Sequence, residues 1–288
     1  MRWDDVCGGT VGLIEVRVVA CVNGVMSGYG EASAKAAGVV IRELQEIAEF
    51  QQVYRLFDEI WHPDPRNVPV TMELMIGFAH TGSYVAGAFE GDVLVGASVG
   101  FLAARRTLHS HVTGAVIGRG IGYALKSHQR DWCLDRGLER ITWTFDPLVR
   151  RNARFNLVKL GAMPEEYLED FYGAMADAIN EGDASDRLLA VWRLAGEGEA
   201  GRPGGVDAAG ARVVLAEGAG GWPDMGAKRA GDVVLVGTPA DVERLRRVDP
   251  AAGRAWRRAV REQLGGLMKA GGQVVGFTDR GEYVVVIN

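Results

Sequence analysis

Apolar residues recur at helical spacing in two segments of the chain. In the first segment they follow the i, i+3, i+4, i+7 pattern of an amphipathic helix, and His62-Pro63-Asp64-Pro65 then stops it. The second segment, residues 121–136, has a similar spacing. The first stripe is Val53, Leu56, Phe57, Ile60 and Trp61, and the second is Ile121, Ala124, Leu125 and Trp132. Two further helices are predicted at residues 70–80 and 152–160, the latter closed by Gly161.

Short runs rich in β-branched and aromatic residues lie between these helices. Residues 84–89 and 93–102 flank Glu90-Gly91-Asp92 and predict a β-hairpin. Further strands are expected at residues 109–117, 141–145 and 188–194. Asp146-Pro147 ends the second of these, because proline cannot continue a central strand. Residues 39–194 therefore read as an α/β module.

The remainder of the chain divides into three segments. Residues 1–38 show no clear period and are expected to be an irregular extension, and residues 195–210 have the composition of a linker or loop. Residues 211–288 predict a C-terminal α/β extension with strands at 233–236, 274–277 and 283–287 and one helix between them, its apolar face running from Ala255 to Met268. This extension either forms a small subdomain or completes the sheet of the first module.

Composition excludes several classes of protein. The 288 residues carry a net charge of −5, which argues against binding to nucleic acid or to an anionic membrane surface. Three cysteines make neither a disulfide framework nor a four-thiolate zinc site, and a cytoplasmic location is expected. Asp4 and Asp5 stand where a signal peptide needs positive charge, so secretion is not expected. Met26 is an alternative start, in which case residues 1–25 would not belong to the native protein.

A glycine-rich turn, Gly118-Arg119-Gly120-Ile121-Gly122, stands between a predicted strand and a predicted helix. Such a turn presents free backbone N–H groups at a helix N-terminus, where a phosphate or pyrophosphate is favoured. The alternative is a tight connection that only needs flexible backbone angles. A P-loop is excluded because Gly-Lys-Ser/Thr is absent, and the glycine spacing does not fit the Rossmann fingerprint.

The order of these elements resembles the GNAT superfamily of acyl-CoA-dependent N-acyltransferases, in particular a bacterial subgroup of predicted acetyltransferases. The segments that carry the resemblance are residues 118–126, 141–148 and 152–162, and it covers roughly residues 40–194. It implies an α/β (α+β) fold with a mixed, mostly antiparallel central sheet flanked by helices. It also implies central strands that separate to admit the pantetheine arm, a glycine turn that holds the CoA pyrophosphate, and a backbone N–H of residues 113–117 facing the thioester oxygen.

Three positions depart from the family pattern. Ile117 replaces the Gln or Arg expected three residues before the G-x-G pair, and the segment before the turn is about three residues short. Leu157 replaces a Tyr that protonates the leaving thiolate in many relatives. A CoA thiol, with a pKa near roughly 8.5, is a tolerable leaving group without such help.

Candidate site residues follow from position and from the resemblance. His109 and His111 alternate along one strand face and are candidates for a base or substrate anchor, as is Asp146 at a strand end, against the alternative of an Asp-Pro turn. Tyr172 and Tyr167 are candidates to replace the missing acid. Lys126 and the cluster Arg150, Arg151 and Arg154 are further candidates for phosphate contact, with a solvated surface as the alternative. The cofactor-binding residues expected from the resemblance are Val116, Ile117, Gly118, Arg119, Gly120, Ile121, Gly122, Tyr123, Asn152, Phe155, Asn156 and Lys159. Cys133 is expected to be a buried thiol, and no metal site is expected.

These observations predict direct transfer of an acetyl or other short acyl group from acyl-CoA to a small-molecule amine, such as an amino acid. One alternative keeps the fold but uses a thioester on an acyl carrier protein, or decarboxylates it. Another is a non-catalytic acyl-CoA-binding relic. The sequence favours a monomer or homodimer without nucleic-acid or membrane partners, and it leaves the acyl group and the acceptor open.

Overall fold

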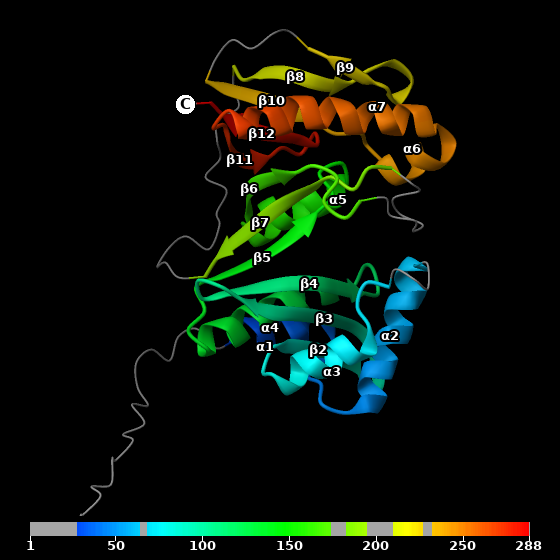
Figure 1. The fold of residues 1–288 in the computed structure, drawn as a ribbon, viewed down its shortest axis with the longest axis vertical. Coiled ribbons are helices and arrows are strands. Elements are labelled where there is room, and N and C mark those ends of the chain that lie inside the picture. The colour runs from blue at the N-terminus through cyan, green and yellow to red at the C-terminus, as the bar shows by residue number, and fades with distance from the viewer. Residues whose placement is uncertain (1–27, 64–67, 174–182, 195–209, 227–231, 288) are drawn as a thin grey trace, which may run out of the picture.

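The computed structural model describes residues 28–63, 68–173, 183–194, 210–226 and 232–287, which form two β-sheets with their own helices (Figure 1). The first sheet has seven strands in the order β1-β2-β3-β4-β5-β7-β6. Its strands are β1 (Val40–Glu43), β2 (Tyr84–Glu90), β3 (Val93–Ala103), β4 (Thr107–Ala115), β5 (Arg140–Phe145), β6 (Met163–Leu168) and β7 (Arg187–Arg193). Every neighbouring pair is antiparallel except β4 and β5. The expectation of a mixed, mostly antiparallel sheet flanked by helices is confirmed.

Helices cover both faces of this sheet. The helices are α1 (Tyr29–Ala37), α2 (Ile47–Trp61), α3 (Met72–His80), α4 (Ile121–Asp135), α5 (Arg150–Ala153) and the π-helical turn η1 (Arg154–Leu160). One apolar cluster joins α2 and α3 to β2 and β3, and another joins α1 and α4 to the other face of the same strands (Figure 1). The sheet is therefore a sandwiched layer, as an α/β module requires.

Local sequence explains where the main helices begin and end. A reciprocal capping box between Glu46 and Glu49 starts α2, and His62 in the left-handed conformation ends it. The predicted stripes are mostly buried, with Val53 and Ile121 completely so and Ile60 and Trp61 partly so. Gly161, with φ of 72°, closes η1 as expected.

The C-terminal residues form a sheet of their own, so they do not extend the first one. Its order is β11-β12-β10-β8-β9, and only β8 and β10 are parallel. The strands are β8 (Arg212–Glu217), β9 (Pro223–Met225), β10 (Val233–Gly237), β11 (Gln273–Phe277) and β12 (Glu282–Val286). The helices are α6 (Val242–Val248), α7 (Pro250–Val260), the π-turn η3 (Arg261–Gly265) and α8 (Gly266–Lys269), with a 3-10 turn η2 (Ala219–Gly221) after β8.

The two sheets share one hydrophobic core. Its buried members include Phe145 and Leu157 of the first unit and Trp256 and Tyr283 of the second. In Figure 1 the second sheet and α7 lie against β6 and α5, at one edge of the first sheet. The C-terminal unit is thus packed onto the first unit rather than tethered beside it.

Several sequence expectations need correction. The last part of the supposed irregular extension, residues 29–37, is a helix, whereas residues 1–27 lie outside the described residues. The strand expected at 109–117 ends at Ala115, which leaves Val116 and Ile117 in the turn. Strands β1, β6, β8 and β9 were not predicted. Strand β6 was not predicted because it contains Pro164, and a proline is tolerated in an edge strand, as β6 is, but not in a central strand.

Candidate active site

Strands β4 and β5 pair over a short stretch and then separate. Their ladder joins only Thr107–His109 to Arg140–Thr142. A bulge falls at the same place, because β3 pairs Val99 with Val112 and Gly100 with Ser110, which leaves His111 without a partner residue. The rest of β4 follows β3 while β5 follows β7, so a gap opens between two neighbouring central strands.

The glycine turn lies at the end of β4 and starts α4. Gly118 and Gly120 have φ of 93° and 75°, which only glycine adopts without strain, and Gly120 is the N-cap residue of the helix. The first N–H groups of the helix, from Ile121 to Tyr123, have no intrahelical acceptor and point out of its end. Backbone geometry and helix dipole together favour an anion here.

A cavity of about 570 Å³, here named the turn cavity, lies beside this helix end. One wall comes from α1, which the sequence pattern did not predict, and the other from the turn, α4 and η1. Arg119 donates two hydrogen bonds to Glu90, and the Lys159 ammonium lies 4.6 Å from the centre of the Tyr123 ring. The lining residues are Gly28, Tyr29, Ala32, Ser33, Ala36, Ala37, Arg119, Gly120, Tyr123 and Lys159. Four of the expected cofactor residues therefore meet at one cavity.

Other expected cofactor residues lie elsewhere. Ile117 is 91% exposed and Val116 48% exposed, and neither lines a described cavity. Gly118 and Gly122 shape the turn without lining the cavity, and Ile121 is buried in the core.

A second cavity, of about 480 Å³, lies where β4 and β5 diverge; it is named the strand-end cavity. Residues of β4, the end of β5, α2, α5 and the C-terminal helix α6 form its walls. The lining residues are Trp61, Pro63, Val68, Pro69, His111, Val112, Thr113, Thr144, Phe145, Asp146, Val149, Arg151, Asn152, Tyr172, Arg187 and Glu243. This cavity collects three of the four expected catalytic residues.

The two histidines share a face, as predicted, but only His111 reaches the cavity. Both rings lie near Phe101, at 5.1 Å and 6.0 Å between centres. His109 Nδ1 is 3.0 Å from Thr142 Oγ1, and burial together with His111 and Lys126 lowers the pKa of His109 to about 4. His111 Nε2 donates to the carbonyl of Pro69 at 2.8 Å, so in the neutral ring Nδ1 is the acceptor nitrogen.

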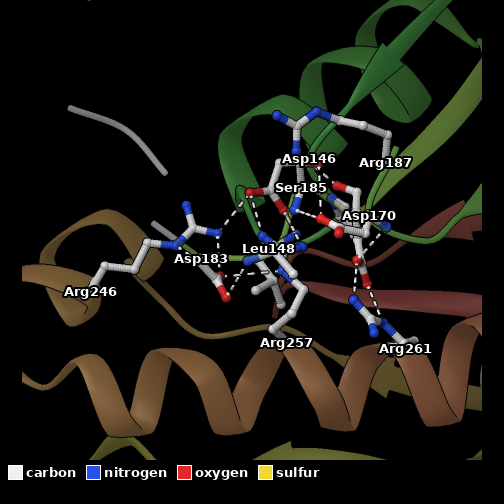
Figure 2. Close-up of polar contacts among 12 residues, drawn as sticks. Asp146, Leu148, Asp170, Asp183, Ser185, Arg187, Arg246, Arg257 and Arg261 are labelled. Carbon is white, nitrogen blue, oxygen red and sulfur yellow. Dashed lines mark hydrogen bonds and ion pairs between the residues drawn. The ribbon is translucent and has the colours of Figure 1, made fainter. Parts of the chain in front are cut away.

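Asp146 is held by arginines of the C-terminal unit and is not available as a base (Figure 2). Arg257 donates to both of its oxygens at 2.9 Å, Arg246 donates to Oδ2 at 2.8 Å, and the Leu148 N–H donates to Oδ1 at 2.9 Å. These cations hold the pKa of Asp146 well below its usual range despite burial. The expected catalytic role of Asp146 is therefore wrong, and the Asp-Pro turn interpretation fits the Leu148 bond.

The same ionic cluster extends along α7. Asp183 accepts from Arg246 at 3.1 Å and from Arg257 at 3.3 Å. Asp186 accepts from Arg261 and, at 2.7 Å, from the hydroxyl of Tyr167 (Figure 2 shows the Arg261 contact). Burial and Asp186 raise the pKa of Tyr167, which removes it as an acid. The sequence analysis did not predict this cluster. The feature of the sequence that could have indicated it is Arg257, a charged residue that directly follows Trp256 of the apolar face of α7.

Tyr172 and Asn152 line the strand-end cavity, whereas Asn156 does not. The Tyr172 hydroxyl is 2.9 Å from Thr144 Oγ1. Asn156, which was expected to bind the cofactor, is buried instead, and its Oδ1 accepts from the indole of Trp143 at 3.2 Å. Phe155 is half-buried against the shared core.

Lys126 is also buried, not exposed to a phosphate. Its ammonium donates to Ser110 Oγ at 2.7 Å and Gln129 Oε1 at 3.3 Å, and it lies 4.0 Å from the centre of a Trp143 ring. Burial lowers the pKa of Lys126 to about 7. The expectation of a phosphate contact at Lys126 is wrong.

The basic cluster at the start of α5 joins the two units. Arg150 donates to the carbonyl of Thr238, Arg151 forms two hydrogen bonds with Glu243, and Arg154 pairs with Asp279. All three partners belong to the C-terminal unit. Neither phosphate binding nor a merely solvated face explains these arginines.

Neither a metal-binding cluster nor a membrane-spanning helix occurs among the described residues. Within them, no three His, Cys, Asp or Glu side chains come together as a metal site, and no helix is long and apolar enough to cross a membrane. Cys133 is buried, as expected, and burial raises the pKa of its thiol to about 12.

Comparisons with known proteins complete the description of this part of the chain. No family model and no curated protein matches the sequence. Solved structures match about half of the chain and nearly all of their own length, with TM-scores below 0.5. They include Ard1 from Thermoplasma volcanium (16% identity, 55% of this chain, 99% of that chain, TM-score 0.45). Another is the ribosomal-protein-S18-alanine N-acetyltransferase from Escherichia coli (13%, 56%, 97%, TM-score 0.45). A third is yncA from Salmonella typhimurium with its cofactor acetyl-CoA (16%, 55%, 95%, TM-score 0.46).

Identities and TM-scores this low carry no argument. The first unit is therefore described by its own strand order and geometry. Helices, a hairpin, a strand, a glycine turn with its helix, and a neighbouring strand that diverges occur here in the order the resemblance implies. The first unit thus has the element order that the resemblance to the GNAT superfamily implies, and it is called the GNAT unit below. In this GNAT unit the turn cavity lies beside the glycine turn. The strand-end cavity lies where β4 and β5 separate.

Proposed function

We propose that the protein is an N-acyltransferase that takes a short acyl group from acyl-CoA and transfers it to a small-molecule amine. The observation that carries the proposal is the gap between β4 and β5, bordered by the glycine turn of α4 and opening at the strand-end cavity. A thioester arm held along β4 would place its phosphates at the turn and its acyl end at the wall formed by Val112 and Thr113.

Backbone amides supply the charge stabilisation that this chemistry needs. The Val116 N–H donates to Val95 of β3 at 3.0 Å. Because successive amides of a strand alternate in direction, the N–H groups of Ala115 and Thr113 point away from β3, toward the gap. A thioester oxygen placed there would receive a hydrogen bond as it becomes an oxyanion.

The turn cavity fits the phosphate end of such a donor. Lys159 and Arg119 provide positive charge at its wall, and the amides of residues 121–123 provide donors at the helix end. Bound CoA would supply the acyl group as a thioester. Arg119 would have to share its guanidinium between the ligand and Glu90.

Proton handling falls to His111 and Tyr172 at the strand-end cavity. His111 Nδ1 is the acceptor nitrogen of the neutral ring and could take a proton from the ammonium of the acceptor, directly or through water, so that the neutral amine attacks the thioester carbon. Tyr172 carries a hydroxyl near the end of β5, where it could protonate the departing thiolate. Leu157, at the position of the family tyrosine, is completely buried and cannot do so.

The first experiment is thermal unfolding with CoA, acetyl-CoA and succinyl-CoA, followed by assays of thiol release with a panel of amines. A ligand at 100 times its Kd stabilises by about 2.7 kcal/mol, which raises the unfolding midpoint visibly. A midpoint that stays unchanged with all three, together with no thiol release, would contradict the proposal.

A carrier-bound donor is the second candidate function, and one observation favours it. Ile117, 91% exposed, and the neighbouring Val116 present apolar surface at the mouth of the gap, where a carrier protein would have to dock. Acyl transfer only from a phosphopantetheinylated carrier, with none from acyl-CoA, would select this alternative. Ile117→Glu should then weaken carrier-dependent transfer, whereas it should leave transfer from free acyl-CoA unchanged.

A further inference from the structure

We infer that the hydroxyl group of Thr113 donates a hydrogen bond to the thioester oxygen during acyl transfer, and that Lys126 and Gln129 are positioning residues that direct its hydrogen. The inference rests on the proposed acyl transfer and adds a side-chain donor to the backbone amides of β4. Thr113 lines the strand-end cavity, beside the gap between β4 and β5. A continuous line of hydrogen bonds reaches it from the buried side of the sheet.

This line of hydrogen bonds runs from α4 through β3 to β4. Lys126 Nζ lies 3.3 Å from Gln129 Oε1, and Gln129 Nε2 lies 3.3 Å from Ser98 Oγ. Ser98 Oγ in turn lies 2.8 Å from Thr113 Oγ1. Lys126 is 5% exposed, and Gln129 and Ser98 are completely buried, so bulk water does not compete for these bonds.

The donors in this line all point away from Lys126. An ammonium group can only donate, so the amide oxygen of Gln129 faces Lys126 and the amide NH2 group faces Ser98. Burial lowers the pKa of Lys126 to about 7, so the neutral amine is also present near neutral pH. The neutral amine keeps two N–H groups, which are enough for its bonds to Ser110 and Gln129, so the direction survives loss of the proton.

Ser98 donates in turn to Thr113. Because Ser98 Oγ accepts from Gln129, its own hydrogen is free for Thr113 Oγ1. If Thr113 donated instead, the buried hydrogen of Ser98 would have no acceptor among the described residues, which costs free energy. With Ser98 as the donor, the hydrogen of the Thr113 hydroxyl has no protein acceptor in the described part of the chain and is available to a ligand in the strand-end cavity.

A thioester oxygen is the ligand atom that suits this hydrogen. The backbone N–H of Thr113 also points toward the gap, so one oxygen can receive both bonds. When the neutral amine attacks, a nitrogen–carbon bond forms and the carbonyl electron pair moves onto this oxygen, and the pair returns when the carbon–sulfur bond breaks. Thr113 keeps its hydrogen throughout, and its bond is strongest while the oxygen carries the charge.

Two substitutions remove this bond in different ways. Thr113→Val deletes the hydroxyl at nearly constant size, whereas Thr113→Ser keeps it. Gln129→Glu keeps the hydroxyl but places a carboxylate, which can only accept, between Lys126 and Ser98. Ser98 must then donate to that carboxylate, so the hydrogen of Thr113 is drawn back to Ser98 and away from the ligand.

The matched control is Thr107→Val. Thr107 lies on the same strand, where β4 is still paired with β5, and its hydroxyl donates to the carbonyl of Arg105 at 3.1 Å. Thiol release from acetyl-CoA is measured for all variants of the full chain, with the amine of the panel that gives the highest rate. Circular dichroism and thermal melts establish that each variant is folded.

We expect Thr113→Val and Gln129→Glu each to lower kcat by about tenfold to a hundredfold, the range for a hydrogen bond to a charged group, with little change in the KM for acetyl-CoA. The double variant should lose no more than either single variant, because both remove the same bond. Thr113→Ser and Thr107→Val should keep most of the wild-type kcat. An unchanged kcat in folded Thr113→Val, or additive losses in the double variant, would overturn the inference while acyl transfer stands.

A spectroscopic measurement lets the two proposals fail separately. The infrared stretching frequency of an isotope-labelled thioester carbonyl is recorded for bound acetyl-CoA without an amine. We expect a lower frequency in the wild type and Thr113→Ser than in Thr113→Val and Gln129→Glu, because a hydrogen bond weakens the carbonyl bond. That result supports the inference even if no acyl group is transferred. Equal frequencies in the wild type and Thr113→Val overturn it, and failure of the wild type to bind acetyl-CoA or acetylated phosphopantetheine overturns both proposals.

Discussion

The ion cluster around Asp146 is expected to be a main source of stability at the junction of the two units. Asp146 lies at the end of β5, and its partners Arg246 and Arg257 lie in α6 and α7. All three side chains are at most 7% exposed. Asp146→Asn keeps the size of the side chain but removes one carboxylate from two buried guanidiniums that both also donate to Asp183.

The magnitude follows from burial. Removing one partner of a buried ion pair typically costs about 3–5 kcal/mol, because the remaining charge loses its compensation. We expect Asp146→Asn to lower the free energy of unfolding by this amount, and Arg257→Gln to do the same. The double variant should cost less than the sum of the two, since both remove one interaction.

Urea unfolding followed by tryptophan fluorescence measures these changes, because Trp256 and Trp143 are buried near the junction. The matched control is Arg193→Gln, which breaks the exposed pair with Glu165 and should cost less than about 1 kcal/mol. A loss below about 1 kcal/mol for Asp146→Asn, or strict additivity with Arg257→Gln, would refute the reasoning.

The pH dependence has a definite sign. The pKa of Asp146 is lowered in the folded state relative to about 3.9 in the unfolded chain, so its contribution is complete above that unfolded value. The contribution is lost as pH falls toward the folded pKa. The difference between wild type and Asp146→Asn should therefore be constant above about pH 5 and shrink below about pH 4.

Three further predictions concern the GNAT unit. Gly120→Ala places a side chain at φ of 75°, so it should lower the free energy of unfolding by about 1–2 kcal/mol and weaken the stabilisation by CoA in thermal melts. Gly122→Ala, at a position with open space and no positive φ, should change neither quantity. Equal effects of the two variants would contradict the role of the turn. The pKa of Lys126 is lowered to about 7 in the folded state, so between about pH 7 and 10.4 the unfolded state binds the extra proton. The free energy of unfolding of the wild type should therefore rise by up to about 1.4 kcal/mol per pH unit, relative to Lys126→Met, as pH rises through that window. His109 has its pKa lowered to about 4, so the wild type should lose stability relative to His109→Gln as pH falls from about 6.5 to 4; parallel urea-unfolding curves across that range would exclude this.

Local sequence patterns were sufficient for much of the first unit. The stripe beginning at Val53 predicted α2, and Glu90-Gly91-Asp92 predicted the hairpin of β2 and β3. The glycine turn predicted the start of α4, because only glycine adopts its backbone angles without strain. These features depend on residues close together in the chain, so their periodicity and turn chemistry determine them.

The tertiary structure determined whether most of the charged candidate residues are buried and which partners they contact. Asp146 and Arg257 are 111 residues apart, and nothing near either one predicts that they meet. The same holds for Arg151 with Glu243, and for Lys126, whose exposure depends on how α4 lies on the sheet. Asn156 lies in the π-helical turn η1, where the sequence predicted an α-helix, and it accepts a hydrogen bond from Trp143 of β5.

The sequence by itself thus determined the main helices, the hairpin and the glycine turn of the first unit, since hydrophobic spacing and backbone sterics act over a few residues. Only the packing of the C-terminal unit on the first unit decided the pairing of Asp146, Arg151 and Arg154. The buried carboxylate of Asp146 is stabilised because two cations are brought to it, and both of them come from the C-terminal unit.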